Sequence, residues 1–184
     1  MIDVRPTRIP EVLEIRSPKH GDDRGFFSEV WNAKTWRAAG IELEFVQDNH
    51  SLSRDAGVLR GLHFQLDPFA QAKLVRVSRG KIFDVAVDLR RGSSTFRQWV
   101  GVILSPTDWN QLLIPVGFAH GFVTLEPDTE VQYKVTAAYS PEHDRAVHFD
   151  DPEIGVEWPF AADAMTLSAK DRAAPSLADH ETTF

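Results

Sequence analysis

The stretch GVLRGLHFQLDPFAQAKLV, from Gly57 to Val75, decides the fold class and also raises the question of function. Both of its ends alternate apolar and polar residues with a period of two, which is typical of β-strands. In the first strand His63 lies on the face opposite to Leu62, and in the second Lys73 shares a face with Val75. The pattern therefore predicts two strands that each carry one basic side chain among apolar neighbours.

Strand-like segments of the same kind recur along the whole chain, and most are bounded by Gly, Pro, Asp or Ser. They are residues 12–17, 25–31, 43–53, 57–65, 72–80, 81–90, 98–105, 110–117, 121–126, 130–139 and 145–149. The run VRVSRGKIFDVAVDLR, residues 75–90, predicts a hairpin with Arg79 and Gly80 at its turn. Residues 32–40, NAKTWRAAG, predict a helix that stops at Gly40.

Many short strands at regular spacing predict an all-β fold, a sandwich or barrel of jelly-roll type with few short helices. The chain contains no repeat, linker or low-complexity segment, so we expect residues 1–184 to form a single domain. The tail, residues 161–184, is less regular, and we expect it to hold one or two helical turns followed by a frayed end.

The composition narrows the chemistry and the partners. The 184 residues include no Cys, which excludes disulfides, zinc–thiolate sites and cysteine nucleophiles. The formal charge of -7 disfavours nucleic acid and anionic lipid as partners. The first residues contain no apolar signal segment, and no apolar run is long enough to span a bilayer. We therefore expect a cytoplasmic protein that binds neither nucleic acid nor membrane.

Four side chains that can move or stabilise protons fall on four different predicted strands. They are His63, Lys73, His120 and Tyr133. For a single histidine, an ordinary core or surface role is the simpler interpretation. The recurrence of such groups on four strands of one small barrel favours a shared site.

Arg60 would strengthen this site if it lay on the same face as His63. In a regular strand the two side chains, three positions apart, point to opposite faces. A β-bulge at Gly61 would bring them together, because it adds one residue to one strand of a pair. The sequence raises this possibility but does not decide it.

A metal site of the cupin type is the first alternative. Pro115, Gly117 and His120 match the spacing of one half of such a site. The other half would need a second histidine where this chain has Gln65, and Lys73 would repel a cation. We therefore expect no metal and no cofactor. A metal-dependent cupin enzyme and a non-catalytic sugar-binding jelly roll stay as alternative hypotheses.

A histidine with a carboxylate partner, a lysine and a tyrosine together suit proton abstraction next to a carbonyl group. The imidazole takes the proton, the ammonium stabilises the enolate oxygen, and the phenol returns a proton from another side. A carboxylate behind the histidine fixes its tautomer and raises its basicity. The residues therefore point to an acid–base enzyme that acts on a carbonyl compound.

The assembled motifs resemble the dTDP-4-dehydrorhamnose 3,5-epimerase family of deoxysugar biosynthesis. The motifs are DDRGFFSEVW, FVQDNHSLS, GVLRGLHFQ, QAKLVRVSRGKIFDVAVDLR, IPVGFAHGF, VQYKV, YSPEHD, DDPEIGVEWP and LSAKD. The resemblance implies a cupin-like jelly roll (double-stranded β-helix), a homodimer with exchanged N-terminal strands, and no cofactor or metal. It also implies inversion of carbons 3 and 5 of dTDP-4-dehydro-6-deoxy-D-glucose, both of which flank the ketone at carbon 4. Some relatives invert only one of these carbons, in antibiotic or surface deoxysugar pathways.

The resemblance also implies roles for individual residues. His63 matches the base, Asp171 its carboxylate partner, Lys73 the enolate-stabilising lysine and Tyr133 the proton donor. Substrate contacts are implied at Gln47, Asn49, Arg60 (pyrophosphate), His120, Tyr139 (stacked on thymine), Asp144 and Lys170, and from the partner subunit at Arg24, Phe27 and Glu29. At position 144 the family often carries Glu, so the shorter Asp144 puts that contact in doubt.

Structural explanations exist for several of these residues as well. Arg24 could be a turn arginine that pairs with Asp22 or Asp23, and Phe27 could be a core residue. Tyr133 could be a core tyrosine with its hydroxyl at the rim.

Overall fold

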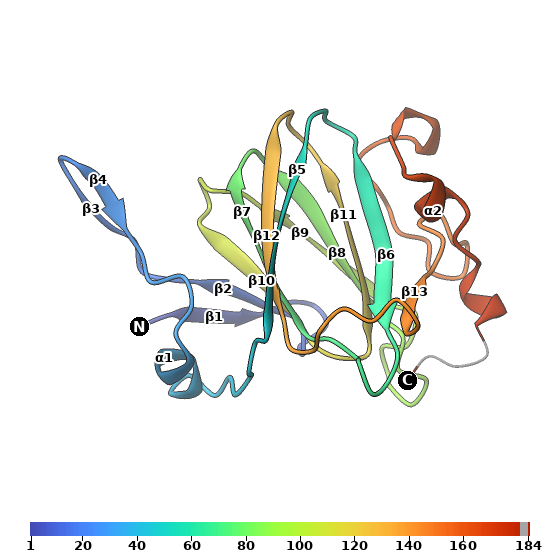
Figure 1. Ribbon diagram of the computed structural model, residues 1–184, viewed down its shortest axis with the longest axis horizontal. Helices are drawn as coiled ribbons and strands as arrows, with labels where there is room; N and C mark the ends of the chain where they lie inside the picture. Colours follow the sequence, from blue (N-terminus) through green and yellow to red (C-terminus); the bar gives the residue numbers. More distant parts are fainter. Residues whose placement is uncertain (181–183) are drawn as a thin grey trace.

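The chain folds into two facing antiparallel β-sheets, described here by a computed structural model for residues 1–180 and 184 (Figure 1). The six-stranded sheet has the order β1 (Asp3–Pro6), β2 (Leu13–Arg16), β10 (Asn110–Ile114), β7 (Lys73–Arg79), β12 (Thr129–Val135) and β5 (Gln47–Ser53). The five-stranded sheet has the order β13 (Asp144–Ala146), β6 (Leu59–Gln65), β11 (Phe118–Thr124), β8 (Ile82–Asp88) and β9 (Trp99–Leu104). The predicted all-β jelly roll is confirmed.

The remaining elements are short and lie around the two sheets. They are the hairpin of β3 (His20–Asp22) and β4 (Gly25–Phe27), the helices α1 (Ala33–Arg37) and α2 (Ala169–Arg172), and two 3-10 turns, Ala162–Ala164 and Leu177–Asp179. Figure 1 shows the β3–β4 hairpin extending away at one end of the molecule, while α2 lies beside β6 at the other end. In the part of the chain that the structure describes, none of the helices has the length and apolar character needed to cross a membrane.

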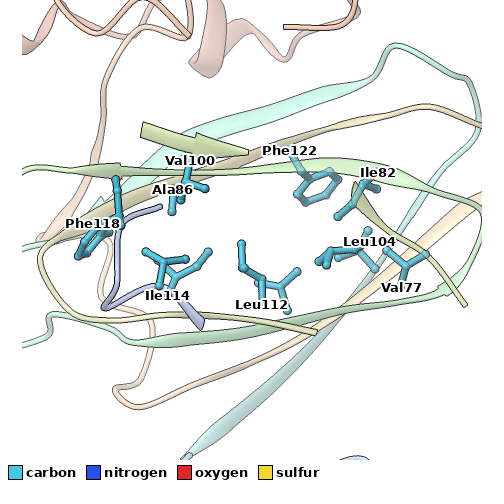
Figure 2. Close-up of a cluster of buried hydrophobic side chains, with 13 residues drawn as sticks. Val77, Ile82, Ala86, Val100, Leu104, Leu112, Ile114, Phe118 and Phe122 are labelled. Carbon is cyan, nitrogen blue, oxygen red and sulfur yellow. The ribbon is translucent and has the colours of Figure 1, made fainter. Parts of the chain in front are cut away.

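The main core lies between the two sheets. Its side chains come from both sheets and point toward one another, as Figure 2 shows for Val77, Ile82, Ala86, Val100, Leu104, Leu112, Ile114, Phe118 and Phe122. Val75 belongs to the same cluster. Burial of each large side chain contributes about 1.5–3 kcal/mol. Lys73 is on the same face of β7 as Val75 and Val77, so the alternation of that strand turns the lysine into the space between the sheets.

The predicted hairpin over residues 75–90 is wrong. β7 pairs with β10 and β12, whereas β8 pairs with β11 and β9, so the two consecutive strands belong to different sheets. The chain crosses between the sheets at Gly80, where φ is +77° and a Cβ atom would lie 2.2 Å from Oγ1 of Thr129. A tight turn between two alternating strands has the same sequence pattern whether it closes a hairpin or a corner, because in both cases one face of each strand is buried.

The helix predicted over residues 32–40 is confirmed as α1. Oδ1 of Asn32 accepts hydrogen bonds from two backbone N–H groups of the first turn, and Gly40, with φ of +85°, follows its end. The helix buries Trp36 against Leu74 and Leu113 on the outer face of the six-stranded sheet.

The tail contains α2 and the two 3-10 turns, and backbone hydrogen bonds tie it to the body of the protein. The N–H of Thr166 donates to the carbonyl of Gly57 at 2.8 Å, and the N–H of Leu59 donates back to Thr166 at 2.9 Å. Further along, Oδ2 of the buried Asp151 accepts a hydrogen bond from the N–H of Leu177 at 2.6 Å. These contacts fix the position of α2 beside β6. The expected frayed end includes residues 181–183, which lie outside the described residues.

Asp88, at the end of β8, is a fully buried carboxylate in a network of hydrogen bonds. It accepts hydrogen bonds from Arg90, Ser93 and Thr95, with N–O and O–O distances of 2.6–2.9 Å. Burial alone would raise its pKa, but these hydrogen bonds outweigh burial and hold the pKa at about 2. The network therefore stabilises the folded state through the ionised carboxylate.

We expect Asp88→Asn to lower the free energy of unfolding at pH 7 by about 2–3 kcal/mol, because the pKa of Asp88 falls from 3.8 to about 2 and each unit corresponds to about 1.36 kcal/mol. Because the folded pKa lies below the ordinary value, this contribution is present above about pH 4 and disappears as the pH falls toward about 2. Urea unfolding of both proteins across this range measures it. A difference that persisted at pH 2 would contradict the assignment.

Candidate active site

A cavity of about 270 Å³ opens between the two sheets and α2. Its walls are formed by Ser51, Arg60, His63, Lys73, His120, Phe122, Tyr133, Ser168, Lys170 and Asp171. The structure thus brings together the four proton-handling side chains that the sequence places on β6, β7, β11 and β12, and it adds Asp171 from α2. The inward-facing Lys73 and His63 point into a cavity rather than into the packed core.

His63 and Asp171 form the first histidine–carboxylate pair of the cavity. Nε2 of His63 lies 2.6 Å from Oδ1 of Asp171, and Oδ2 of Asp171 accepts a hydrogen bond from Ser168 at 2.8 Å. Burial alone would raise the pKa of Asp171, but hydrogen bonds from His63 and Ser168 outweigh it and hold the pKa below its ordinary value. Because an ionised carboxylate can only accept, Nε2 of His63 carries a proton, and in the neutral ring Nδ1 holds the lone pair that a base needs.

Lys73 places a buried ammonium beside this pair. Its Nζ donates a hydrogen bond to the carbonyl of His63 at 3.1 Å, and the residue is only 7% exposed. Burial lowers the pKa of Lys73 to about 8, against the opposing charges of Asp144 and Asp84. The side chain is therefore mostly positive near pH 7, and it can stabilise a negative oxygen in the cavity.

Tyr133 faces the same cavity from the opposite sheet to His63. The tyrosine is on β12 of the six-stranded sheet, and the histidine is on β6 of the five-stranded sheet. Burial raises the pKa of Tyr133, so the phenol keeps its proton. Among the described residues its hydroxyl has no hydrogen-bond partner, which leaves it available to a ligand. A base and an acid therefore approach the cavity from two sides.

The bulge that would bring Arg60 to the face of His63 is present. Between Arg60 and His63, two residues of β6 stand opposite one residue of β11, so the strand gains the extra residue of a bulge. Gly61 has φ of +138°, and a Cβ atom there would lie 2.4 Å from Cα of Gly121. Glycine at this position allows the two strands to approach closely, and Arg60 lines the cavity together with His63.

A second histidine–carboxylate pair lies deeper in the cavity wall. Nε2 of His120 is 2.6 Å from Oδ1 of Asp84, and both side chains are buried. Burial lowers the pKa of His120, although the charge of Asp84 and its hydrogen bond act in the opposite direction. Asp84 was not among the predicted site residues. An acidic residue inside the apolar run KIFDVAVD is the signal that could have revealed it.

Several predicted substrate contacts form a hydrogen-bonded chain next to the cavity. Lys170, which lines the cavity, pairs with Asp144, and the hydroxyl of Tyr139 donates to the same Asp144 oxygen at 3.2 Å. Gln47 accepts from the N–H of Tyr139 at 3.0 Å and donates to Asn49 at 2.8 Å. The shorter arm of Asp144 thus still reaches Lys170 and Tyr139, while the substrate contacts of these residues stay predictions.

Arg24, Phe27 and Glu29 are not brought to the cavity in this single chain. Arg24 is exposed on the β3–β4 hairpin and pairs with Asp22 at 2.5 Å. Phe27 is 72% exposed, and with Glu29 it lines a separate cavity beside the N-terminal residues. Their implied role in the site of a partner subunit stays a prediction.

Three further cavity residues were missed from the sequence, namely Ser51, Phe122 and Ser168. Alternation along the strands could have found two of them, because Ser51 has the parity of Asn49 and Phe122 has the parity of His120. Ser168 has no such signal, because it begins α2 in the irregular tail, where it caps the helix.

The side chains of the cavity are poorly suited to a divalent metal ion. Within residues 1–180 and 184, no three His, Asp, Glu or Cys side chains are grouped so that they could hold an ion. Each of the two histidines already contacts a carboxylate through Nε2, and the ammonium of Lys73 lies in the same wall.

The chain is similar to proteins of one family over nearly its whole length. Residues 6–179 match the family model described as dTDP-4-dehydrorhamnose 3,5-epimerase. A protein of that name from Sinorhizobium fredii is 53% identical over 176 residues, which cover 96% of this chain and 90% of the relative.

Two solved structures show the same similarity in three dimensions. A dTDP-6-deoxy-D-glucose-3,5-epimerase from Legionella pneumophila, solved with dTDP-4-keto-L-rhamnose, is 46% identical with a TM-score of 0.92, covering 97% of this chain and 94% of that one. A 3'-monoepimerase from Streptomyces bikiniensis, solved with dTDP-quinovose, is 31% identical with a TM-score of 0.87, covering 95% and 87%. The chain therefore belongs to the dTDP-4-dehydrorhamnose 3,5-epimerase family.

Proposed function

We propose that this protein is a dTDP-4-dehydrorhamnose 3,5-epimerase, an isomerase that inverts carbons 3 and 5 of dTDP-4-dehydro-6-deoxy-D-glucose and forms dTDP-4-dehydro-L-rhamnose. The observation that carries this proposal is the position of His63 and Tyr133 on opposite sheets of one cavity, with Lys73 beside them. Inversion requires that a proton leaves one face of a carbon and another arrives on the opposite face. A base and an acid on opposite walls meet this requirement.

The reaction follows from the states of these three side chains. Nδ1 of His63 removes the proton from a carbon next to the ketone, and the electron pair of the C–H bond moves to the ketone oxygen. The ammonium of Lys73 stabilises the resulting enolate oxygen. Tyr133 then gives a proton to the opposite face of the carbon, which restores the ketone. Because carbons 3 and 5 flank the same ketone, one set of groups serves both.

The remaining predicted contacts are part of the same proposal. Arg60 and Lys170 supply positive charge for the diphosphate of the substrate in a chain whose overall charge is -7. Gln47, Asn49, His120, Tyr139 and Asp144 complete the substrate contacts. These protein groups supply the base, the acid and the stabilising charge, so the mechanism needs no cofactor.

We also infer the organisation in which the site works. Residues 1–184 form one domain whose tail, 161–184, supplies Asp171 and Lys170; the shared core between the two sheets supports this. The exposed Phe27 on the projecting hairpin supports a homodimer in which Arg24, Phe27 and Glu29 reach the partner's cavity. Because the proposed substrate is a nucleotide sugar, we also infer that the enzyme acts in the cytoplasm.

Proton exchange in heavy water tests the proposed function directly. The protein is incubated with dTDP-4-dehydro-6-deoxy-D-glucose in deuterium oxide, and NMR measures deuterium at each ring carbon. We expect deuterium at carbons 3 and 5, with the L-rhamnose configuration in the product. Heat-denatured protein serves as the control for exchange without enzyme.

The same experiment separates the proposal from its rivals. Deuterium at a single carbon would identify an epimerase that inverts only that carbon. This is the second candidate function, because a related protein from Streptomyces bikiniensis is named a 3'-monoepimerase. No exchange above the control would reject the epimerase function and favour a binding protein.

A further inference from the structure

Asp84 is a buried carboxylate that the mechanism above does not use. It lies on the inner face of β8 between the core residues Ile82 and Ala86, and it is 0% exposed. Its Oδ1 meets Nε2 of His120 at 2.6 Å, while its Oδ2 is buried and has no hydrogen-bond partner among the described residues. Burial of such a group is costly unless it is well paired. Asp84 is therefore connected to the cavity through its contact with His120, which lines the cavity wall.

The geometry sets the tautomer of His120. A carboxylate accepts hydrogen bonds, so the proton of the ring lies on Nε2, between the ring and Asp84. Burial, together with the positive charge of Lys73, lowers the pKa of His120, which keeps the ring neutral near pH 7. Nδ1 then holds a lone pair. Within the described part of the chain Nδ1 has no partner, and His120 lines the cavity, so Nδ1 is the atom left for a ligand.

His63 and His120 face each other across the β6–β11 pair and both contact a carboxylate through Nε2, yet they differ in environment. The side chain of His63 is 30% exposed, whereas that of His120 is 7% exposed and lies beside the ammonium of Lys73. Formation of a second imidazolium at His120 would place another positive charge in this buried wall. His120 is thus suited to accept a hydrogen bond, rather than to remove a proton from carbon.

We propose that Asp84 is a positioning residue, which holds His120 with its proton on Nε2 so that Nδ1 accepts a hydrogen bond from a hydroxyl group of the sugar. This inference rests on the proposed function, which supplies a sugar with hydroxyls at carbons 2 and 3. The ketone oxygen has no proton to donate, so it cannot be the partner of Nδ1. Lys73 and Tyr133 carry the donors that the ketone and its neighbouring carbons need.

The first experiment reads the tautomer without reference to activity. NMR of ¹⁵N-labelled wild-type protein distinguishes a ring nitrogen that carries a proton from one that holds a lone pair. We expect His120 to show a proton on Nε2 and a lone pair on Nδ1, and Asp84→Asn to lose this preference. A proton on Nδ1 in the wild-type protein would overturn the proposal, even if Asp84→Asn does not fold.

The second experiment identifies the partner of Nδ1. Two substrate analogues, lacking the hydroxyl at carbon 2 or at carbon 3, both keep carbon 5, where deuterium uptake is measured. We expect the wild-type protein to exchange one analogue about 10–100-fold more slowly than the parent sugar, and Asp84→Asn to slow the parent by a similar factor. The Asp84→Asn variant should then exchange the analogue that lacks this hydroxyl almost as fast as it exchanges the parent sugar. Equal rates of the wild type on all three sugars, or a full additional loss in the variant, would overturn the proposal.

Asp88→Asn is the matched control, because Asp88 is a fully buried carboxylate on the same face of the same strand, four residues further on. It should lower stability but leave the tautomer of His120 and the preference between analogues unchanged.

The experiments also distinguish failure of the proposed function from failure of the role proposed for Asp84. If the wild type exchanges no carbon-bound proton of the parent sugar, the proposed function is rejected, together with the sugar hydroxyl as the partner of Nδ1. If it exchanges normally but His120 has the other tautomer, only the role of Asp84 is rejected.

Discussion

His63→Ala is expected to lower kcat by about 10²–10⁴-fold, the range that a positioned base contributes. Nδ1 of His63 is the basic atom that the pair with Asp171 leaves free in the cavity. Without it no group of the same wall is placed to take the proton, because Lys73 is mostly protonated and His120 is the more deeply buried ring. Initial rates and deuterium uptake at carbons 3 and 5 measure the loss together.

His50→Ala is the control for this variant. His50 is an exposed histidine on β5 that contacts Glu130 and takes no part in the cavity. We expect it to keep the wild-type rate, and thermal unfolding should show that both variants are folded. A folded His63→Ala protein with a rate near that of the wild type would show that another group is the base.

Tyr133→Phe is expected to separate proton removal from inversion. The variant keeps the ring, which packs against the main core, and loses only the hydroxyl that faces the cavity. His63 can still remove a proton and take deuterium from the solvent, so we expect exchange to continue. Inversion should fall by about 10²–10⁴-fold, because the donor on the opposite sheet is absent. NMR measures the two outcomes on one sample, as deuterium content and as ring configuration.

Tyr139→Phe removes the hydroxyl of the only other tyrosine in the chain. That hydroxyl contacts Asp144 in the hydrogen-bonded chain beside the cavity. We expect this control to change KM while exchange and inversion stay coupled. Full formation of the inverted product by Tyr133→Phe would show that the proton comes from another donor.

The sequence pattern predicts the fold class and the direction of some side chains, but it does not predict which strands pair. Alternation along each strand correctly predicts an all-β protein and the inward direction of Lys73, because one face of every strand must be buried. The same alternation cannot assign strands to sheets, so it predicts a hairpin where the chain turns a corner at Gly80. That choice depends on contacts between distant strands, such as β7 with β12, which a local pattern does not contain.

The two carboxylates of the cavity illustrate the same limit. Asp171 is 108 residues from His63 in the chain, and its position depends on backbone hydrogen bonds that tie the tail to β6. Only the resemblance to a family pointed to it. The resemblance assigns no role to Asp84, and the sequence offers only an acidic residue inside the apolar run of β8 as a signal. Its partner became visible only when β8 and β11 were placed side by side.

The attachment of α2 has a consequence for the growing polypeptide. The strands from β1 to β13 are all synthesised by Ala146, but the carboxylate that orients His63 emerges only with Asp171. At about 5–20 residues per second, the ribosome synthesises His63 several seconds before Asp171. A nascent chain, or one that is cut before α2, therefore has all the strands of the two sheets but lacks the carboxylate that orients His63. On the proposed mechanism, the site is therefore complete only after residue 171 has been synthesised.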